Sequence, residues 1–388
     1  MRMKFGVFMA PFHELGENPT TALERDLQLL ELLDELGYDE AWIGEHHSVG
    51  WETIASPEVF IAVASQRTRR IKLGTGVVSL PYHHPLMVAN RMVLLDHLTR
   101  GRVMLGVGPG ALITDAFMLG IEPNRQREMM AEALDAIMEL LTSEEPVTCQ
   151  TDWFKLVDAR IQLRPYTEPY MPIAVASVQS PAGVTLAGKH GLGVITIAHR
   201  VGVRGLVDIS QQWRIAEDTA AEHGKQMRRE EWRINMPVYL ADSKQQALDD
   251  VRERGNRFVI DYQYNGTGSA EPDGGPLESI VDRMAASGAA VIGTPDDLIA
   301  TIERYQEITG GFGCLLVQVN EWASWEKTRH SYELLARYVM PRFQGSLRNL
   351  EASYSQAASH VAQTRHARRA AIEHAHESYE RRLDKLPS

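Results

Sequence analysis

Residues 71–107 read IKLGTGVVSLPYHHPLMVANRMVLLDHLTRGRVMLGV and contain one complete strand–helix–strand unit. Ile71–Ser79 is a β-branched run typical of a buried strand, Pro85–Leu98 carries apolar residues at helical spacing, and Val103–Val107 is apolar again. A connection that contains a helix joins parallel strands, because antiparallel neighbours need only a short turn. The segment therefore predicts two neighbouring parallel strands in an α/β fold.

The same alternation recurs along the whole chain. Six further strands are predicted at Lys4–Met9, Glu40–Gly44, Pro172–Ala176, Gly193–Ile197, Ile234–Leu240 and Cys314–Val319. Helices are predicted at Thr20–Leu36, Pro57–Thr68, Pro85–Leu98, Arg125–Leu141, Pro181–His190, Val203–His223, Ser243–Phe258 and Pro295–Thr309. Eight strand-then-helix units predict a (β/α)8 TIM barrel. An open doubly wound sheet is the alternative, although no GxGxxG follows the first strand.

Three segments depart from this rhythm. Thr148–Leu163 predicts a short hairpin, and Tyr262–Gly288 is rich in Gly, Ser, Asp and Pro, which makes 262–288 either a candidate lid loop or a surface insertion. We therefore expect a barrel over residues 1–343 with these insertions. Residues 344–388 predict one long amphipathic C-terminal helix, because apolar residues recur there at near-heptad spacing, and we expect it to pack on the barrel or on a second subunit.

The bulk properties exclude several classes of protein. The chain of 388 residues has a formal net charge of −11, which argues against a nucleic-acid partner. No run of about 18 apolar residues predicts a membrane span, and the opening MRMKFGVFMAPF has a strand pattern rather than a signal-peptide core, so we expect a cytoplasmic protein without a membrane partner. Cys149 and Cys314 have neither CxxC nor Cys/His spacing, so no disulfide framework or zinc site is indicated.

A closed barrel places its active site at the carboxyl ends of its strands. The motif WIGEHH puts Glu45, His46 and His47 at the end of the second strand, where an imidazole near its ordinary pKa serves as a base around pH 7. A metal site is not indicated, because adjacent side chains diverge and no third ligand follows at a recognisable spacing.

Glycines mark two further strand ends. Gly74 and Gly76 interrupt the third strand, which indicates a bulge, a kink that closes the barrel, or close approach of a flat ligand. The fourth strand runs into GVGPG, and Arg127 then opens a helix where a guanidinium and the helix N-terminus suit a phosphate, although it also fits a plain surface charge. Apolar residues near strand ends are candidates for an apolar substrate pocket or for the core: Phe8, Phe12, Trp51, Met104 and Met118.

These motifs, in this order, resemble the bacterial luciferase family of flavin-dependent monooxygenases. The resemblance rests on KFGVFM, WIGEHH, LGTGVVSLPYHHP, LLDHLTRGRVMLGVGPG and VIGTPDDLIATIERY, and it runs from Met3 to about Phe343. The strings LPYHHPLMVANRMVLLDHLTRGR and GPGALITDAFMLGI look closest to the limonene 1,2-monooxygenase-like branch.

The resemblance implies roles for individual residues. His46 matches the catalytic histidine, with His47 beside it as a candidate for the substrate pocket. Gly76 and Val77 match a pair joined by a non-prolyl cis peptide that supports the isoalloxazine ring, with Thr75 at the ring edge. The resemblance assigns the cofactor phosphate to Arg127 and to three residues of a second segment, Ser177, Ser180 and Gly183. In that segment Ser180 precedes Pro181 at the start of a predicted helix, whose free amides suit an anion. Pro109 stands where luciferase has a further arginine.

The implied activity is that of a two-component monooxygenase. Reduced FMN (FMNH2), or alternatively reduced FAD, reacts with O2, and one oxygen atom enters a small, cyclic organic substrate through a C4a-(hydro)peroxyflavin by hydroxylation, epoxidation or Baeyer–Villiger insertion. A separate NAD(P)H-dependent flavin reductase and a homodimer or homotetramer are the expected partners. Two other classes stay open: a deazaflavin-dependent hydride-transfer oxidoreductase and a non-catalytic flavin-binding barrel.

Overall fold

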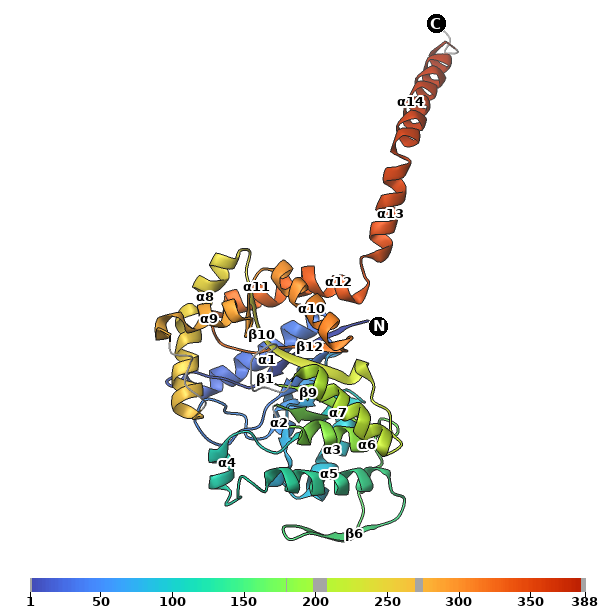
Figure 1. The fold of residues 1–388 in the computed structure, drawn as a ribbon. Helices are drawn as coiled ribbons and strands as arrows, with labels where there is room; N and C mark the ends of the chain where they lie inside the picture. The colour runs from blue at the N-terminus through green and yellow to red at the C-terminus, as the bar shows by residue number, and fades with distance from the viewer. Residues whose placement is uncertain (1, 179, 198–207, 269–274, 385–388) are drawn as a thin grey trace. The chain divides into compact units, whose positions relative to one another are not determined.

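A closed barrel of eight parallel strands forms the centre of the protein in the computed structural model, which describes residues 2–178, 180–197, 208–268 and 275–384 (Figure 1). The strands are β1 (Lys4–Met9), β2 (Glu40–Ile43), β3 (Lys72–Thr75), β5 (Val103–Gly108), β8 (Ile173–Ser177), β9 (Gly193–Thr196), β10 (Trp232–Leu240) and β12 (Cys314–Gln318). They pair in that order, and β12 pairs with both β10 and β1, which closes the ring. The predicted (β/α)8 barrel is confirmed.

The predicted third strand is divided into β3 and β4 (Val78–Ser79) by a cis peptide bond between Gly76 and Val77. Both parts pair with β5, Leu73 opposite Val103 and Val78 opposite Val107. The Thr75 hydroxyl lies at the break, where it donates to the Gly106 carbonyl at 2.7 Å and accepts from the Gly106 amide at 2.9 Å. The Thr75 side chain thus makes the hydrogen bonds to β5 at the point where backbone pairing between the strands is interrupted.

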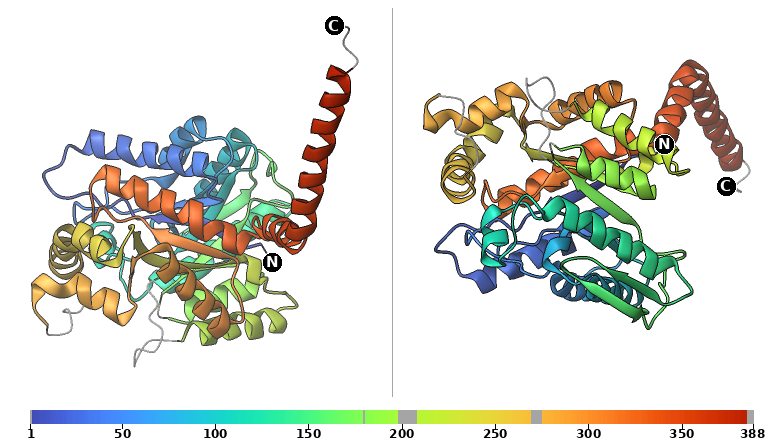
Figure 2. Two further views of the ribbon diagram at one scale, coloured as in Figure 1. Left: turned by 90° about the horizontal axis from the view of Figure 1, so that it is seen from above. Right: turned by 60° about the horizontal axis from the view of Figure 1, so that its bottom comes forward.

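Eight of the described helices lie outside the barrel strands (Figure 2). They are α1 (Pro19–Leu36), α2 (Pro57–Arg67), α3 (Pro85–Thr99), α5 (Gln126–Thr142), α6 (Ala182–His190), α7 (Ile209–Glu222), α8 (Lys244–Arg257) and α10 (Pro295–Thr309). Helix α1 begins earlier than predicted, because the Asn18 side chain accepts the Thr20 and Thr21 amides. The start predicted for α7, residues 203–207, lies outside the described residues.

Several short elements were not predicted. Helix α4 (Ile113–Met118) follows β5, and strand β11 (Val291–Gly293) pairs with the carboxyl end of β10. Helix α11 (Trp325–Leu334) follows β12 and continues through η5 (Leu335–Val339) into α12 (Met340–Gln344). The predicted hairpin is present as the antiparallel pair β6 (Val147–Gln150) and β7 (Lys155–Ala159).

The segment expected to be a lid loop, 262–288, is helical over much of its described part. The π-helix η3 (Phe258–Gly266) continues α8, and a short turn η4 (Leu277–Ser279) leads into α9 (Ile280–Ser287). Ile280 and Val281 are buried against α8, so burial of apolar residues overrides the loop-like composition. Residues 269–274 lie outside the described part of the chain.

A buried ion pair lies at the amino-terminal end of the barrel. The Arg233 guanidinium of β10 donates to both carboxylate oxygens of Glu40 of β2, at 2.6 and 3.0 Å, and to Glu231 at 2.9 Å. It also lies over the indole ring of Trp42, 4.9 Å from the ring centroid. The side chains of Arg233 and Glu40 are almost completely buried, so each charge depends on the other.

Residues 341–388 form a second unit, separate from residues 1–340. It contains α13 (Arg348–Ser359) and α14 (Val361–Leu383), where a single helix was predicted. The break falls at His360, whose amide bonds to the Ala357 carbonyl in a tight turn. The apolar residues of both helices are exposed, among them Leu350 and Tyr354. None of the described helices of the protein has the length and apolarity needed to cross a membrane.

Candidate active site

A cavity of about 670 Å³ opens among the carboxyl ends of the barrel strands. Nine residues predicted from the sequence line it: Phe8, Phe12, His46, Gly76, Val77, Arg127, Ser177, Ser180 and Gly183. They come from segments that are far apart in the chain, and the barrel brings them together because the strands that precede them are neighbours. The histidine, the cis peptide and the candidate phosphate ligands thus share one cavity.

His46 follows β2 and lies between two carboxylates. Its Nδ1 is 3.1 Å from Asp115 Oδ2, and its Nε2 is 3.1 Å from Glu52 Oε2. Burial opposes the charged imidazolium, but Glu52 and Asp115 outweigh it and raise the pKa of His46 above the ordinary value. The arrangement favours a proton on each ring nitrogen of His46 at the cavity wall.

Asp115 lies on α4 and is held by several donors. One oxygen is near His46, and the other accepts from the His47 amide at 3.1 Å and from the Ser48 hydroxyl. Burial alone would raise the pKa of Asp115, yet these hydrogen bonds and the nearby imidazole lower it. Asp115 therefore remains a carboxylate and orients His46.

Glu52 approaches His46 from the loop after β2. It forms an antiparallel bridge with Phe12, and one of its oxygens accepts the hydroxyl proton of Tyr262 from η3. The side chain is buried, and burial raises the pKa of Glu52, while His46 and the Tyr262 hydrogen bond act in the opposite direction. Glu52 and Tyr262 both line the cavity.

Glu45 also lines the cavity, but its oxygens are already engaged. One oxygen accepts from His47 Nε2 at 2.9 Å and His83 Nε2 at 2.7 Å, and the other accepts from the Ser79 amide at 2.9 Å. These donors offset the effect of burial and lower the pKa of Glu45. Glu45 therefore fastens the end of β2 to β4, and it ties His47 away from the cavity.

The far part of the cavity has the chemistry of an anion site. The exposed Arg127 guanidinium makes no hydrogen bond or ion pair with any described residue, and the buried Ser177 hydroxyl is unpartnered there as well. The Ser180 hydroxyl accepts a hydrogen bond from the Ala182 amide at 3.2 Å. Helix α6 begins at Ala182, one residue later than predicted. A free cation, hydroxyls and a helix N-terminus suit a phosphate dianion.

Glycine at position 183 is required by close packing at this site. A Cβ there would lie 2.4 Å from the Ala176 carbonyl oxygen, so a side chain would push α6 away from the end of β8. In β10, the buried Oδ1 of Asn235 has no partner among described residues and also lines the cavity. Unpartnered buried polar atoms of this kind are expected where a polar ligand binds, so the cavity fits a phosphorylated flavin.

Five of the predicted site residues do not line this cavity: Thr75, His47, Trp51, Met104 and Met118. The Thr75 hydroxyl is bonded to Gly106, and His47 to Glu45. Trp51 and Met104 are core residues, whereas Met118 is 67% exposed on α4. Gly74 was interpreted as a possible ligand contact, but the structure gives another reason for this glycine. A Cβ added at this position would lie 2.5 Å from the Trp42 ring.

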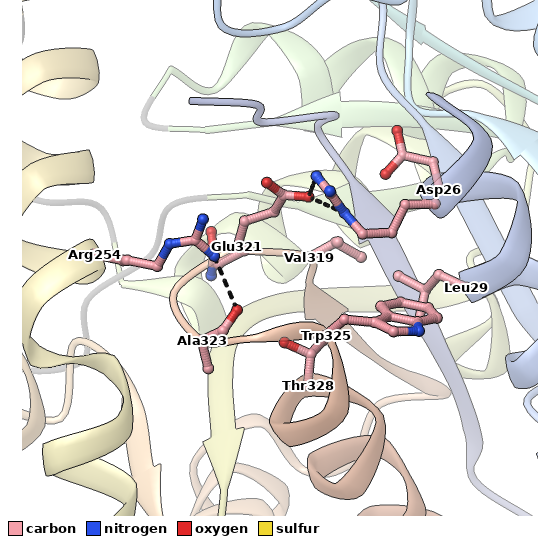
Figure 3. A pocket seen from close by; sticks show the side chains of 10 residues that line it. Asp26, Leu29, Arg254, Val319, Glu321, Ala323, Trp325 and Thr328 are labelled. Atoms are coloured by element: carbon pink, nitrogen blue, oxygen red, sulfur yellow. Dashed lines mark hydrogen bonds and ion pairs between the residues drawn. The ribbon is translucent and has the colours of Figure 1, made fainter. Parts of the chain in front are cut away.

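A second, smaller cavity of about 70 Å³ lies between α1, α8 and the segment after β12 (Figure 3). Arg25 pairs with Glu321 and Glu17, and Arg254 donates to the Ala323 carbonyl at 3.2 Å. His13 lies beside this group, with its Nε2 3.0 Å from Asp26 Oδ2. The volume is too small for a flavin, and Arg25 already supplies the positive charge that Glu321 requires.

Sequence reasoning missed three residues at the centre of the site: Glu52, Asp115 and Tyr262. Glu52 lies in a segment without a motif, Asp115 lies in the quoted string GPGALITDAFMLGI but was given no role, and Tyr262 was included only as the edge of the candidate lid. The signal was indirect, since a histidine at a barrel mouth needs partners that orient its ring nitrogens.

Comparisons with known proteins identify the family. A family model described as luciferase-like monooxygenase matches residues 3–310. The chain is 49% identical over 374 residues to 4-hydroxyprotoasukamycin monooxygenase of Streptomyces nodosus subsp. asukaensis, covering 95% of this chain and 100% of that protein. It is 47% identical over 348 residues to limonene 1,2-monooxygenase of Rhodococcus erythropolis, covering 89% and 88%.

A solved structure shares the fold. It is the oxygenating constituent of 3,6-diketocamphane monooxygenase from Pseudomonas putida, a type II Baeyer–Villiger monooxygenase in complex with FMN. The TM-score is 0.71 at 24% sequence identity, and the match covers 88% of this chain and 98% of that one.

Proposed function

The chain belongs to the luciferase-like monooxygenase family, and from that premise we propose that it uses reduced FMN and O2 to insert one oxygen atom into a small, apolar, cyclic molecule. In coarser terms it is a flavin-dependent monooxygenase that acts on an organic substrate. One observation carries the finer proposal: a single cavity is lined by His46, which lies between two carboxylates, by Arg127, which pairs with no described residue, and by the start of α6.

The parts of the cavity have separate tasks in this proposal. Arg127, Ser177, Ser180 and the first turn of α6 hold the phosphate, and the Gly76–Val77 backbone supports the ring. A bound reduced flavin supplies the electrons and the site at which O2 is activated. The apolar wall around Phe8 and Phe12 binds the substrate and excludes water.

His46 sets the protonation of the reacting oxygen. Glu52 and Asp115 raise the pKa of His46 and so favour a proton on its Nε2 at the cavity wall. When the oxygen that is to be transferred is protonated, it reacts as an electrophile, and its expected substrates are alkenes and electron-rich rings. We therefore favour epoxidation or hydroxylation over Baeyer–Villiger insertion for this chain. The reduced flavin is expected to come from a separate NAD(P)H-dependent reductase, since the sequence has no dinucleotide fingerprint.

Binding of reduced FMN and reduced riboflavin to an Arg127→Met variant tests the phosphate assignment. Under anaerobic conditions we expect FMN affinity to fall by roughly tenfold, because an exposed charged hydrogen bond is lost, while riboflavin affinity stays unchanged. Arg125→Met is the matched control, because Arg125 pairs with Asp152 and does not line the cavity. Equal losses for FMN and riboflavin would contradict the assignment.

Product analysis tests the reaction itself. The wild-type protein, reduced FMN and ¹⁸O2 are incubated with cyclic alkenes, phenols and cyclic ketones, and mass spectrometry identifies which compound gains one labelled oxygen atom. We expect labelled epoxide or alcohol. Binding of a reduced deazaflavin in preference to FMN, with hydride transfer and no labelled product, would instead support the hydride-transfer alternative.

A further inference from the structure

We propose that Tyr262 and Glu52 are positioning residues that connect η3 to His46, so that His46 is set to deliver its proton when η3 is docked on the cavity. The inference rests on the proposed function, in which His46 controls the protonation of the reacting oxygen. It assigns to η3 a role in the chemistry beyond that of covering the cavity.

The contacts form a continuous chain from the helix to the histidine. Tyr262 of η3 donates its hydroxyl to Glu52 Oε1, and Glu52 Oε2 lies 3.1 Å from His46 Nε2. Glu52 Oε2 accepts no hydrogen bond of good geometry from any described residue. The direction in which this oxygen points therefore depends on how the other oxygen is held, and Tyr262 is the group that holds it.

The two ends of this chain are anchored differently. The loop that carries Glu52 is fixed to the segment after β1 by the Phe12–Glu52 bridge and by the His13 amide, which donates to the Trp51 carbonyl at 2.8 Å. His13 Nδ1 also contacts the Thr53 hydroxyl at 3.0 Å. These contacts tie the Glu52 loop to the barrel, although the rings of Phe12 and Trp51 also pack against η3.

Tyr262, in contrast, reaches the cavity from an irregular helix. A π-helical turn adds a residue to each loop of backbone and changes the direction of the side chains that follow. The Tyr262 ring stacks on Phe258, with centroids 5.3 Å apart, and contacts Phe12 edge to face at 4.9 Å. This aromatic packing holds the hydroxyl against Glu52, so a displacement of η3 would break the hydrogen bond between Tyr262 and the carboxylate.

The electrostatic consequence has a definite sign. Burial raises the pKa of Glu52, and the hydrogen bond from Tyr262 is one of the interactions that lower it, so loss of the hydroxyl favours neutral Glu52. His46 faces Glu52 from the β2 loop, Asp115 from α4 and Glu45 from the end of β2. Neutral Glu52 removes one of these negative charges, and the pKa of His46 then falls. Undocking of η3 therefore leaves less of His46 protonated, so less of it carries a proton to deliver.

Histidine titration by NMR tests the coupling in the flavin-free, full-length protein. Samples carry ¹³C-labelled histidine, and His46→Gln identifies the His46 resonance. We expect Tyr262→Phe, which keeps the ring stack, and Glu52→Gln each to lower the pKa of His46. The double variant should match Glu52→Gln, because the hydroxyl acts through that carboxylate. Tyr264→Phe is the control, an exposed tyrosine of the same helix that does not line the cavity, and it should leave the His46 titration unchanged.

Steady-state kinetics provides the second measurement. In Tyr262→Phe we expect kcat to fall by roughly tenfold at pH 8 with KM for the substrate unchanged, and the alkaline limb of the kcat profile to move to lower pH. An unchanged His46 titration in both Tyr262→Phe and Glu52→Gln would overturn the inference. A wild-type protein that forms no oxygenated product would instead sink the proposed function, while the NMR titrations would still decide the coupling.

Discussion

Replacing Glu40 by glutamine should destabilise the barrel by leaving a buried arginine without its counter-charge. The Arg233 guanidinium donates to both oxygens of Glu40, and glutamine keeps the shape of the side chain but removes the negative charge. Glu231, 2.9 Å away with a side chain 21% exposed, is the remaining partner and is partly solvated. The variant therefore isolates the charge of one buried residue.

The structure gives the size of the effect in two ways. Burial would raise the pKa of Glu40, but Arg233 and Lys4 lower it from 4.5 to about 2, which corresponds to about 3 kcal/mol of stabilisation of the carboxylate. Removing one partner of a buried ion pair typically costs roughly 3–5 kcal/mol. Because Glu231 remains, we expect the lower end of that range, about 3 kcal/mol.

Urea denaturation followed by tryptophan fluorescence measures this loss. For a chain of this size the midpoint at pH 7 should fall by about 1 M. The pKa of Glu40 is lower in the folded than in the unfolded state, so its contribution is complete above about pH 4.5 and disappears as the pH falls towards 2. The gap between wild type and variant should therefore be constant from pH 8 to 5 and narrow below that.

Two matched variants make the test specific. Glu231→Gln removes the partly exposed partner of the same arginine and should cost about 1 kcal/mol or less. The double variant Glu40→Met with Arg233→Met removes both buried charges and should recover most of the stability. A Glu40→Gln protein as stable as the wild type at pH 7, or a Glu231→Gln protein equally damaged, would refute the reasoning.

Three further predictions concern other parts of the chain. Asp115→Asn should lower the pKa of His46, which the carboxylate raises, so the alkaline limb of the kcat profile moves to lower pH and kcat at pH 8 falls roughly tenfold; an unmoved limb would contradict the role of Asp115. Thr75→Val should lower the free energy of unfolding by about 1–3 kcal/mol in urea titrations, because both hydrogen bonds to Gly106 are lost, whereas Thr75→Ser should retain them. We also propose that residues 344–388 mediate self-association, so a chain ending at Phe343 should elute as a smaller assembly in gel filtration; an unchanged size would count against this.

The regular part of the fold was predictable because its signal is local. Strands such as Lys4–Met9 and helices such as Pro295–Thr309 have an unbroken apolar period with recognisable ends, and the structure confirms them. The short elements had no such signal. Helix α4 has six residues and β11 three, and both are stabilised by contacts with segments that are distant in the sequence.

The candidate site was predictable to the extent that its residues belong to motifs. His46, Arg127 and Gly183 stand in recognisable strings, and the structure brings them into one cavity. Glu52 and Asp115 become partners of His46 only through folding, because the bridge to Phe12 and the placement of α4 join loops that no local pattern relates. Met118 was assigned to the pocket from its apolar character alone, but it lies on the exposed face of α4. Apolar character does not distinguish a pocket residue from an exposed one.

The hydrogen bonding of Glu45 has a practical consequence for anyone altering substrate preference at this barrel mouth. The Glu45 carboxylate already accepts hydrogen bonds from two imidazoles and an amide, so its role is to connect two strands rather than to react. Saturation mutagenesis at Glu45 would remove the link between the end of β2 and β4, the strand that follows the Gly76–Val77 peptide. Phe8 faces the same space and is a better position to vary.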